Sequence, residues 1–95
     1  MSTIIIEKTT TENQTNWTAG DHTLTKNTYD NGSVEWRVTS NFNTNCTLHI
    51  DLATNELRYA AASTTAKVED MDKLIEELQN VKQIAEAFQQ IIATN

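Results

Sequence analysis

The stretch VEDMDKLIEELQNVKQIAEAFQQIIA, residues 68–93, decides the fold that the sequence predicts. Its apolar residues recur every three or four positions, which places them on one side of an α-helix. The segment contains no proline or glycine that would kink or end the helix. The apolar stripe is wider than the two rows of a coiled coil and therefore predicts a long helix that lies on a sheet. It consists of Met71, Leu74, Ile75, Leu78, Val81, Ile84, Ala85, Phe88, Ile91 and Ile92.

The length of this helix predicts an overhang. Residues 69–93 would span roughly 37 Å as a helix, whereas a strand of about seven residues spans only about 23 Å. We expect the overhang at the C-terminal end, where Phe88, Ile91 and Ile92 would form an exposed apolar patch. The sequence thus predicts a homo-oligomer, with a dimer as the simplest form, joined partly through these three residues. The alternative is that the sheet or the N-terminal strand covers them.

Upstream of the helix, strand patterns alternate with turns. Asp30-Asn31-Gly32 marks a hairpin turn, whereas residues 10–16 are polar and predict a loop before a brief strand at 17–19. Short connections require antiparallel neighbours. The predicted fold class is therefore α+β: a four- or five-stranded antiparallel β-meander packed against one long C-terminal α-helix, in two layers and one domain. The predicted strands cover residues 3–9, 22–29, 33–40, 45–52 and 56–62, the helix covers 68–93, and the domain covers 1–95.

The alternation of apolar and polar residues predicts which side chains face the helix. On the strand that follows the hairpin, Trp36 and its apolar neighbours face inward and Arg37 faces outward. The inward rows of the last two strands are Cys46, Leu48, Ile50 and Leu52, followed by Leu57, Tyr59 and Ala61.

The formal net charge is −6, and the acidic residues cluster at the start of the predicted helix. Proteins that bind nucleic acid usually present a basic face, so bulk attraction to nucleic acid is not expected. This acidic cluster could simply be the solvated face of the helix. If it has a function, we expect it to be a binding surface for a basic partner. Its members are Glu69, Asp70, Asp72, Glu76 and Glu77.

No combination of residues predicts catalysis. Cys46 and His49 are three positions apart on a strand, so they point to opposite faces and cannot act as nucleophile and base. His49 and Asp51 share the outward face but have no nucleophile nearby in sequence. Two histidines and one cysteine do not supply the paired ligands of a metal site, and two glycines cannot build a phosphate-binding loop. We expect no enzyme, no metal and no cofactor.

The outward face of the sheet is a second candidate surface. Arg37, His49 and Arg58 are expected to project from it among threonines, where they could hold a nucleic acid strand or a protein edge. A meander followed by a helix resembles, in topology, the single-stranded-DNA-binding coactivators, whose dimers use a curved sheet. This resemblance implies single-stranded nucleic-acid binding as an alternative function. Trp36 and Tyr59, which could stack on bases, are expected on the core side instead.

By elimination, the sequence predicts a small non-catalytic interaction protein. Its size, acidic charge and proline-free, Thr- and Asn-rich composition resemble those of many small phage or mobile-element proteins, including inhibitors of host defence. The resemblance implies binding and inhibition or modulation of a host macromolecule, with a protein as the preferred partner. Binding would use the acidic cluster or the outward sheet face. A further alternative is a small ligand at a subunit interface, because a thin two-layer fold has little room for a pocket of its own.

The same features predict where the protein acts. A single cysteine, Cys46, excludes an intramolecular disulfide, and no stretch is long and apolar enough for a signal peptide or a membrane span. We expect a cytoplasmic protein without membrane contact, located in the host cell if a phage encodes it.

Overall fold

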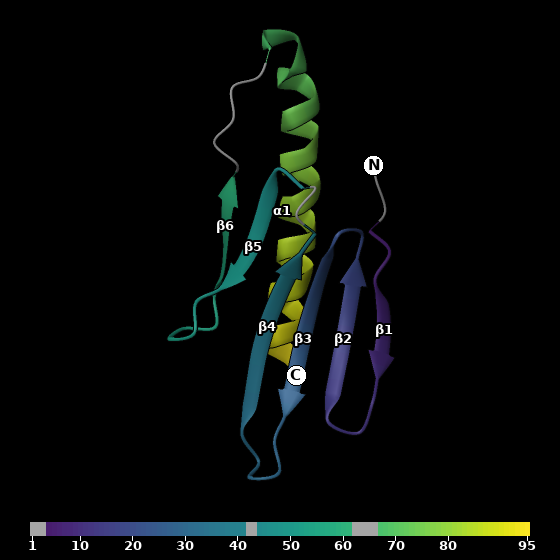
Figure 1. The fold of residues 1–95 in the computed structure, drawn as a ribbon, viewed down its shortest axis with the longest axis vertical. Coiled ribbons are helices and arrows are strands. Elements are labelled where there is room, and N and C mark those ends of the chain that lie inside the picture. Colours follow the sequence, from purple (N-terminus) through teal and green to yellow (C-terminus); the bar gives the residue numbers. More distant parts are fainter. Residues whose placement is uncertain (1–3, 42–43, 62–66) are drawn as a thin grey trace.

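The computed structural model describes residues 4–41, 44–61 and 67–95 (Figure 1). Within these ranges the chain forms six strands, then a short 3₁₀ turn, then one long helix. The elements are β1 (Glu7–Thr10), β2 (Gln14–Ala19), β3 (His22–Thr28), β4 (Val34–Ser40), β5 (Cys46–Ile50), β6 (Leu57–Ala61), η1 (Val68–Asp70) and α1 (Met71–Thr94).

The strands form two antiparallel sheets that share one covering helix. The larger sheet has the order β1-β2-β3-β4, and the hairpin β5-β6 forms the smaller one. In Figure 1, β5 lies beside the upper end of β4, and α1 runs behind the strands. The predicted α+β fold, with an antiparallel meander and one C-terminal helix, is confirmed. No helix among the described residues combines the length and the apolar character needed to cross a lipid bilayer.

The strand β2 differs from the prediction, because residues 10–16 were expected to form a loop. Its polar side chains make their hydrogen bonds across the sheet, which the sequence pattern does not reveal. Gln14 Nε2 donates to Asn27 Oδ1 at 2.9 Å, and Thr25 Oγ1 donates to Asn16 Oδ1 at 2.6 Å. The first strand also differs, because it was expected over residues 3–9 and β1 begins only at Glu7. At the other predicted boundaries the differences are at most three residues, and residues 3 and 62 lie outside the described residues.

The core lies between the strands and the part of α1 from Val81 onward, and β5 contributes Cys46 and Leu48 to it. Phe88 and Leu24 are completely buried, and the indole rings of Trp17 and Trp36 stack with their centroids 5.8 Å apart. Lys26 lies on the helix side of the sheet, with its Nζ 5.7 Å from the centroid of Trp36. This ammonium also donates to the backbone carbonyl of Asn95 at 3.0 Å, at the negative end of the helix dipole.

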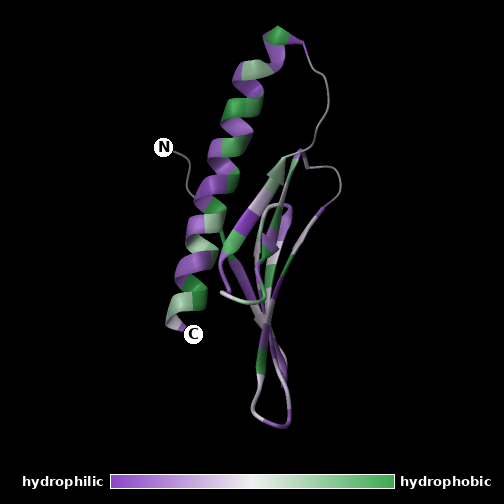
Figure 2. Cartoon of the chain, turned by 90° about the vertical axis from the view of Figure 1, so that its left-hand side faces the viewer, coloured by the Kyte–Doolittle hydropathy of each residue, from purple (hydrophilic) through white to green (hydrophobic). Residues whose placement is uncertain are grey.

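The helix does extend past the sheet, but the overhang is at the opposite end from the one expected. Phe88 is buried and Ile91 and Ile92 are partly buried against the core, so the prediction that these three form the overhanging patch is wrong. Every residue from 68 to 76 is exposed instead, and Figure 2 shows this end of α1 standing away from the strands. Phe88, the one aromatic residue of the helix, lies in its second half and is buried in the same cluster as the two tryptophans. We call residues 68–76 the overhang.

The burial of Phe88 gives a direct test of this placement. Replacing Phe88 with Ala should lower the free energy of unfolding by about 3–5 kcal/mol, because it removes a fully buried ring and leaves a cavity. Urea denaturation followed by circular dichroism measures the change. The control is Leu52→Ala, at a side chain that is 80% exposed, which should stay within about 0.5 kcal/mol of the parent. Unchanged stability together with a changed oligomeric mass would instead place Phe88 at a contact between chains.

Candidate interaction surface

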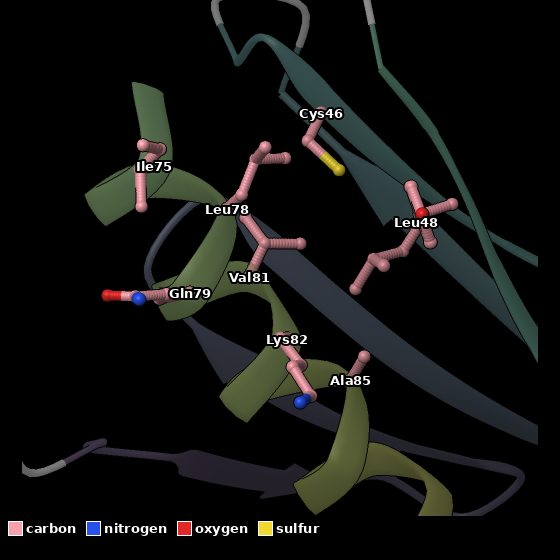
Figure 3. A pocket seen from close by; sticks show the side chains of 9 residues that line it. Cys46, Leu48, Ile75, Leu78, Gln79, Val81, Lys82 and Ala85 are labelled. Atoms are coloured by element: carbon pink, nitrogen blue, oxygen red, sulfur yellow. The ribbon is translucent and has the colours of Figure 1, made fainter. Parts of the chain in front are cut away.

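An apolar cleft of about 340 Å³ lies between α1 and the β5-β6 hairpin. Figure 3 shows Cys46 and Leu48 of β5 pointing toward the helix, with Leu78 and Val81 pointing back toward them. The helix passes over the hairpin at a distance that leaves this space partly open. The complete lining is Cys46, Leu48, Tyr59, Ile75, Leu78, Gln79, Val81, Lys82 and Ala85.

The apolar lining continues beyond the cleft onto the overhang. There the stripe that packs on the core in the second half of α1 has no strand beneath it. We define the apolar surface as five side chains that are between 41% and 81% exposed: Tyr59, Val68, Met71, Leu74 and Ile75. A contiguous patch of this kind marks an interaction site more often than scattered apolar residues do.

Two polar side chains of α1 hold the hairpin and so set the width of the cleft. The carboxylate of Glu77 accepts the backbone N–H of Asn45 and its side-chain Nδ2–H, both at 3.1 Å. Three helical turns later, Gln89 Oε1 accepts the backbone N–H of Leu57 at 3.1 Å. These contacts tie both ends of the hairpin to α1 without closing the space between them.

The acidic cluster is divided between two roles. Glu69, Asp70, Asp72 and Glu76 are exposed on the overhang, and Glu69 Oε1 lies 3.7 Å from Lys67 Nζ. Glu77 is turned toward the hairpin and is partly buried there. The sequence pattern grouped it with the others because it could not show that Asn45 would need an acceptor.

The predicted outward residues lie on the sheet face away from α1. Arg37 Nε pairs with Glu35 Oε1 at 2.6 Å, and Arg58 Nε pairs with Asp51 Oδ2 at 3.3 Å. His49 lies opposite Arg58 in the β5-β6 register, and its Nε2 is 3.0 Å from the hydroxyl of Thr47. Each guanidinium is therefore partly neutralised by a neighbouring carboxylate.

The candidate reactive groups are kept apart. Cys46 is buried in the core and His49 is exposed, as their spacing on one strand predicts. Burial raises the pKa of the Cys46 thiol, and the charge of Glu77 raises it further, so the reactive thiolate is disfavoured. Among the described residues, no three His, Cys, Asp or Glu side chains lie close enough together to hold a metal ion.

His22 has a structural role that the sequence did not indicate. Its ring is buried, and its Nδ1 lies 2.8 Å from the hydroxyl oxygen of Ser40. The same oxygen accepts the backbone N–H of Leu48 at 3.1 Å, so one hydroxyl connects β3, β4 and β5. The sequence feature that could have revealed this role is the position of His22 two residues before Leu24, which places it on the row that faces the helix.

Comparison of the chain with protein-family models, with curated proteins and with solved structures finds no match.

The environment of His22 predicts a loss of stability in acid. Burial lowers the pKa of the imidazole, and the charges of Asp21 and Glu77 oppose this shift only in part. The unfolded chain binds the proton more readily than the folded one. The contribution of neutral His22 to the free energy of unfolding is therefore fully present above the unfolded pKa of about 6.5 and is lost as the pH drops below that value. Urea unfolding at about pH 7.5 and about pH 5.5 measures the difference.

The variant His22→Asn keeps a polar group near Ser40 but removes the titrating ring. We expect a smaller dependence of stability on pH over this interval than in the parent. The matched control is His49→Asn, which removes the other imidazole from an exposed position and should retain the parent's loss. Equal pH dependence of the parent and His22→Asn would contradict this assignment.

Proposed function

We propose that this chain is a small non-catalytic binding protein that attaches to another protein through the overhang of α1 and thereby inhibits or modulates it. One observation carries the proposal. The overhang extends beyond the strands and exposes the carboxylates of Glu69, Asp70, Asp72 and Glu76. Small phage-encoded proteins that act on host macromolecules have a comparable size and charge, and this chain is proposed to act in the same way in the host cytoplasm.

The acidic side of the overhang suits a partner with a basic surface. Glu69, Asp72 and Glu76 fall within roughly 60° of one another around the helix at about 100° per residue. A basic partner surface would be attracted by these carboxylates, which increases the rate of encounter and selects the partner.

Two alternative functions, binding of single-stranded nucleic acid and binding of a small ligand, have less support from the structure. Binding of single-stranded nucleic acid would depend on Arg37 and Arg58, and each of these already lies beside a carboxylate on a chain with a net charge of −6. A small apolar ligand is favoured by one specific observation, the cleft of about 340 Å³, which is at the lower end of the size range of ligand pockets.

Charge reversal on the overhang tests the proposal. The triple variant Glu69→Lys, Asp72→Lys and Glu76→Lys should lose most of the partner that the tagged parent captures from a nuclease-treated lysate of its native host. Binding of the purified partner should weaken several-fold or more and become less sensitive to salt. Capture is compared by mass spectrometry, and affinity is measured by titration at two salt concentrations.

The matched control reverses the same amount of charge at three exposed carboxylates elsewhere, Glu7→Lys, Glu12→Lys and Glu56→Lys. This control should retain the partner. Equal loss in both triple variants would mean that the partner responds to net charge and not to the overhang. A partner that is recovered only when nuclease is omitted would favour the nucleic-acid alternative.

A further inference from the structure

We infer that the apolar surface is covered by the same surface of a second copy of this chain, with the two α1 helices antiparallel and a two-fold axis near Ile75. This homodimer uses the side of the overhang next to the acidic one, so the acidic side stays available to a different partner. The inference therefore does not depend on the proposed function.

The exposed area is sufficient for such an interface. The apolar surface leaves on the order of 500 Å² of side chain in water, which is at the upper end of what soluble monomers expose. Pairing two copies would bury roughly 1,000 Å² in total, which is at the lower limit for a specific interface and suits a weak dimer. A single copy has no described strand that could cover this area, because β5 and β6 are held at the width of the cleft by Glu77 and Gln89.

The spacing of the apolar residues suits a second helix. Met71, Leu78 and Ala85 are seven residues apart, and Leu74 and Val81 form the interleaved row. Rows with this period form the contact seam between paired helices. In this chain the seam packs on the core around Val81 and then continues, exposed, to the end of the overhang. A second helix can extend the same packing where the sheet ends.

The distribution of charge favours the antiparallel arrangement. Lys82 lies on the same side of α1 as the cleft, with its Nζ 3.9 Å from Glu86 Oε1, whereas the acidic cluster lies at the other end of the contact segment. With a two-fold axis near Ile75, each Lys82 would approach the acidic first turn of the second copy. The two helix dipoles would also be antiparallel, which is the favourable arrangement. A parallel pair would place the two acidic ends side by side.

The first test measures mass and perturbs the centre of the interface. By light scattering at micromolar concentration, the full chain should have twice its monomer mass of 10.7 kDa. The variant Ile75→Glu places two carboxylates next to each other at the axis and should weaken dimerisation at least about 100-fold. Because Ile75 is 49% exposed, this variant should still fold, which circular dichroism checks. The control Leu52→Glu changes an exposed apolar side chain outside the surface and should remain dimeric.

The second test determines the direction of pairing. In a Cys46→Ala background, Ile75→Cys should form a disulfide-linked dimer on mild oxidation, because the two sulfurs lie beside the axis. Val68→Cys should not, because the two copies of that position would be separated by roughly 21 Å along the antiparallel pair. Cross-linking of both variants would indicate parallel helices and overturn the antiparallel arrangement.

Each remaining outcome decides against the dimer. A monomeric mass for the parent overturns it, and a monomer that retains additional mass in native mass spectrometry assigns the cleft to a small ligand. Loss of dimerisation by Leu52→Glu as well as by Ile75→Glu would place the interface elsewhere. If the parent is monomeric while charge reversal on the overhang still abolishes partner capture, the proposed function stands and only the dimer fails.

Discussion

The packing of the second half of α1 onto the stacked tryptophans determines the position of every other feature. Val81 near the middle of the helix, and Ile84 and Phe88 in its second half, are buried with Trp17 and Trp36 in one cluster. A helix of 24 residues is rigid and longer than the strands below it, so fixing one end leaves the other end beyond the sheet. The exposed apolar residues of the overhang are therefore a consequence of where the helix is anchored.

The sequence predicted the elements with the strongest patterns and missed those that depend on contacts between distant residues. The period of α1 and the hairpin at Gly32 were sufficient to predict the helix and the strands on either side of that turn. A brief strand was predicted at residues 17–19, but the first half of β2 was missed because Gln14 and Asn16 are satisfied by partners on β3, a stabilisation that has no local signature. Helix length predicted an overhang, but it could not show which end would be anchored.

The candidate surface was also only partly predictable. Tyr59 lies opposite Leu48 in the register, as alternation predicts, yet it is 72% exposed because α1 stands away from β6. Leu52 was expected to face the core, but β5 ends at Ile50 and Leu52 lies in the following turn. In both cases alternation gives the direction of a side chain, whereas burial depends on whether another element reaches it. The acidic residues of the overhang were identified, because charged clusters are visible in sequence.

The paired tryptophans have a further consequence for how this molecule can be observed. Both indoles of the chain belong to the core under the second half of α1, and none lies in the hairpin or on the overhang. Their near-ultraviolet absorption and emission will therefore change when the larger sheet unfolds, but will hardly change when a partner binds at the overhang. Tyrosine absorption does not distinguish the two ends in the same way, because Tyr59 is exposed beside the cleft and Tyr29 is exposed at the β3-β4 turn. Tryptophan fluorescence can thus follow unfolding of the core without an attached label.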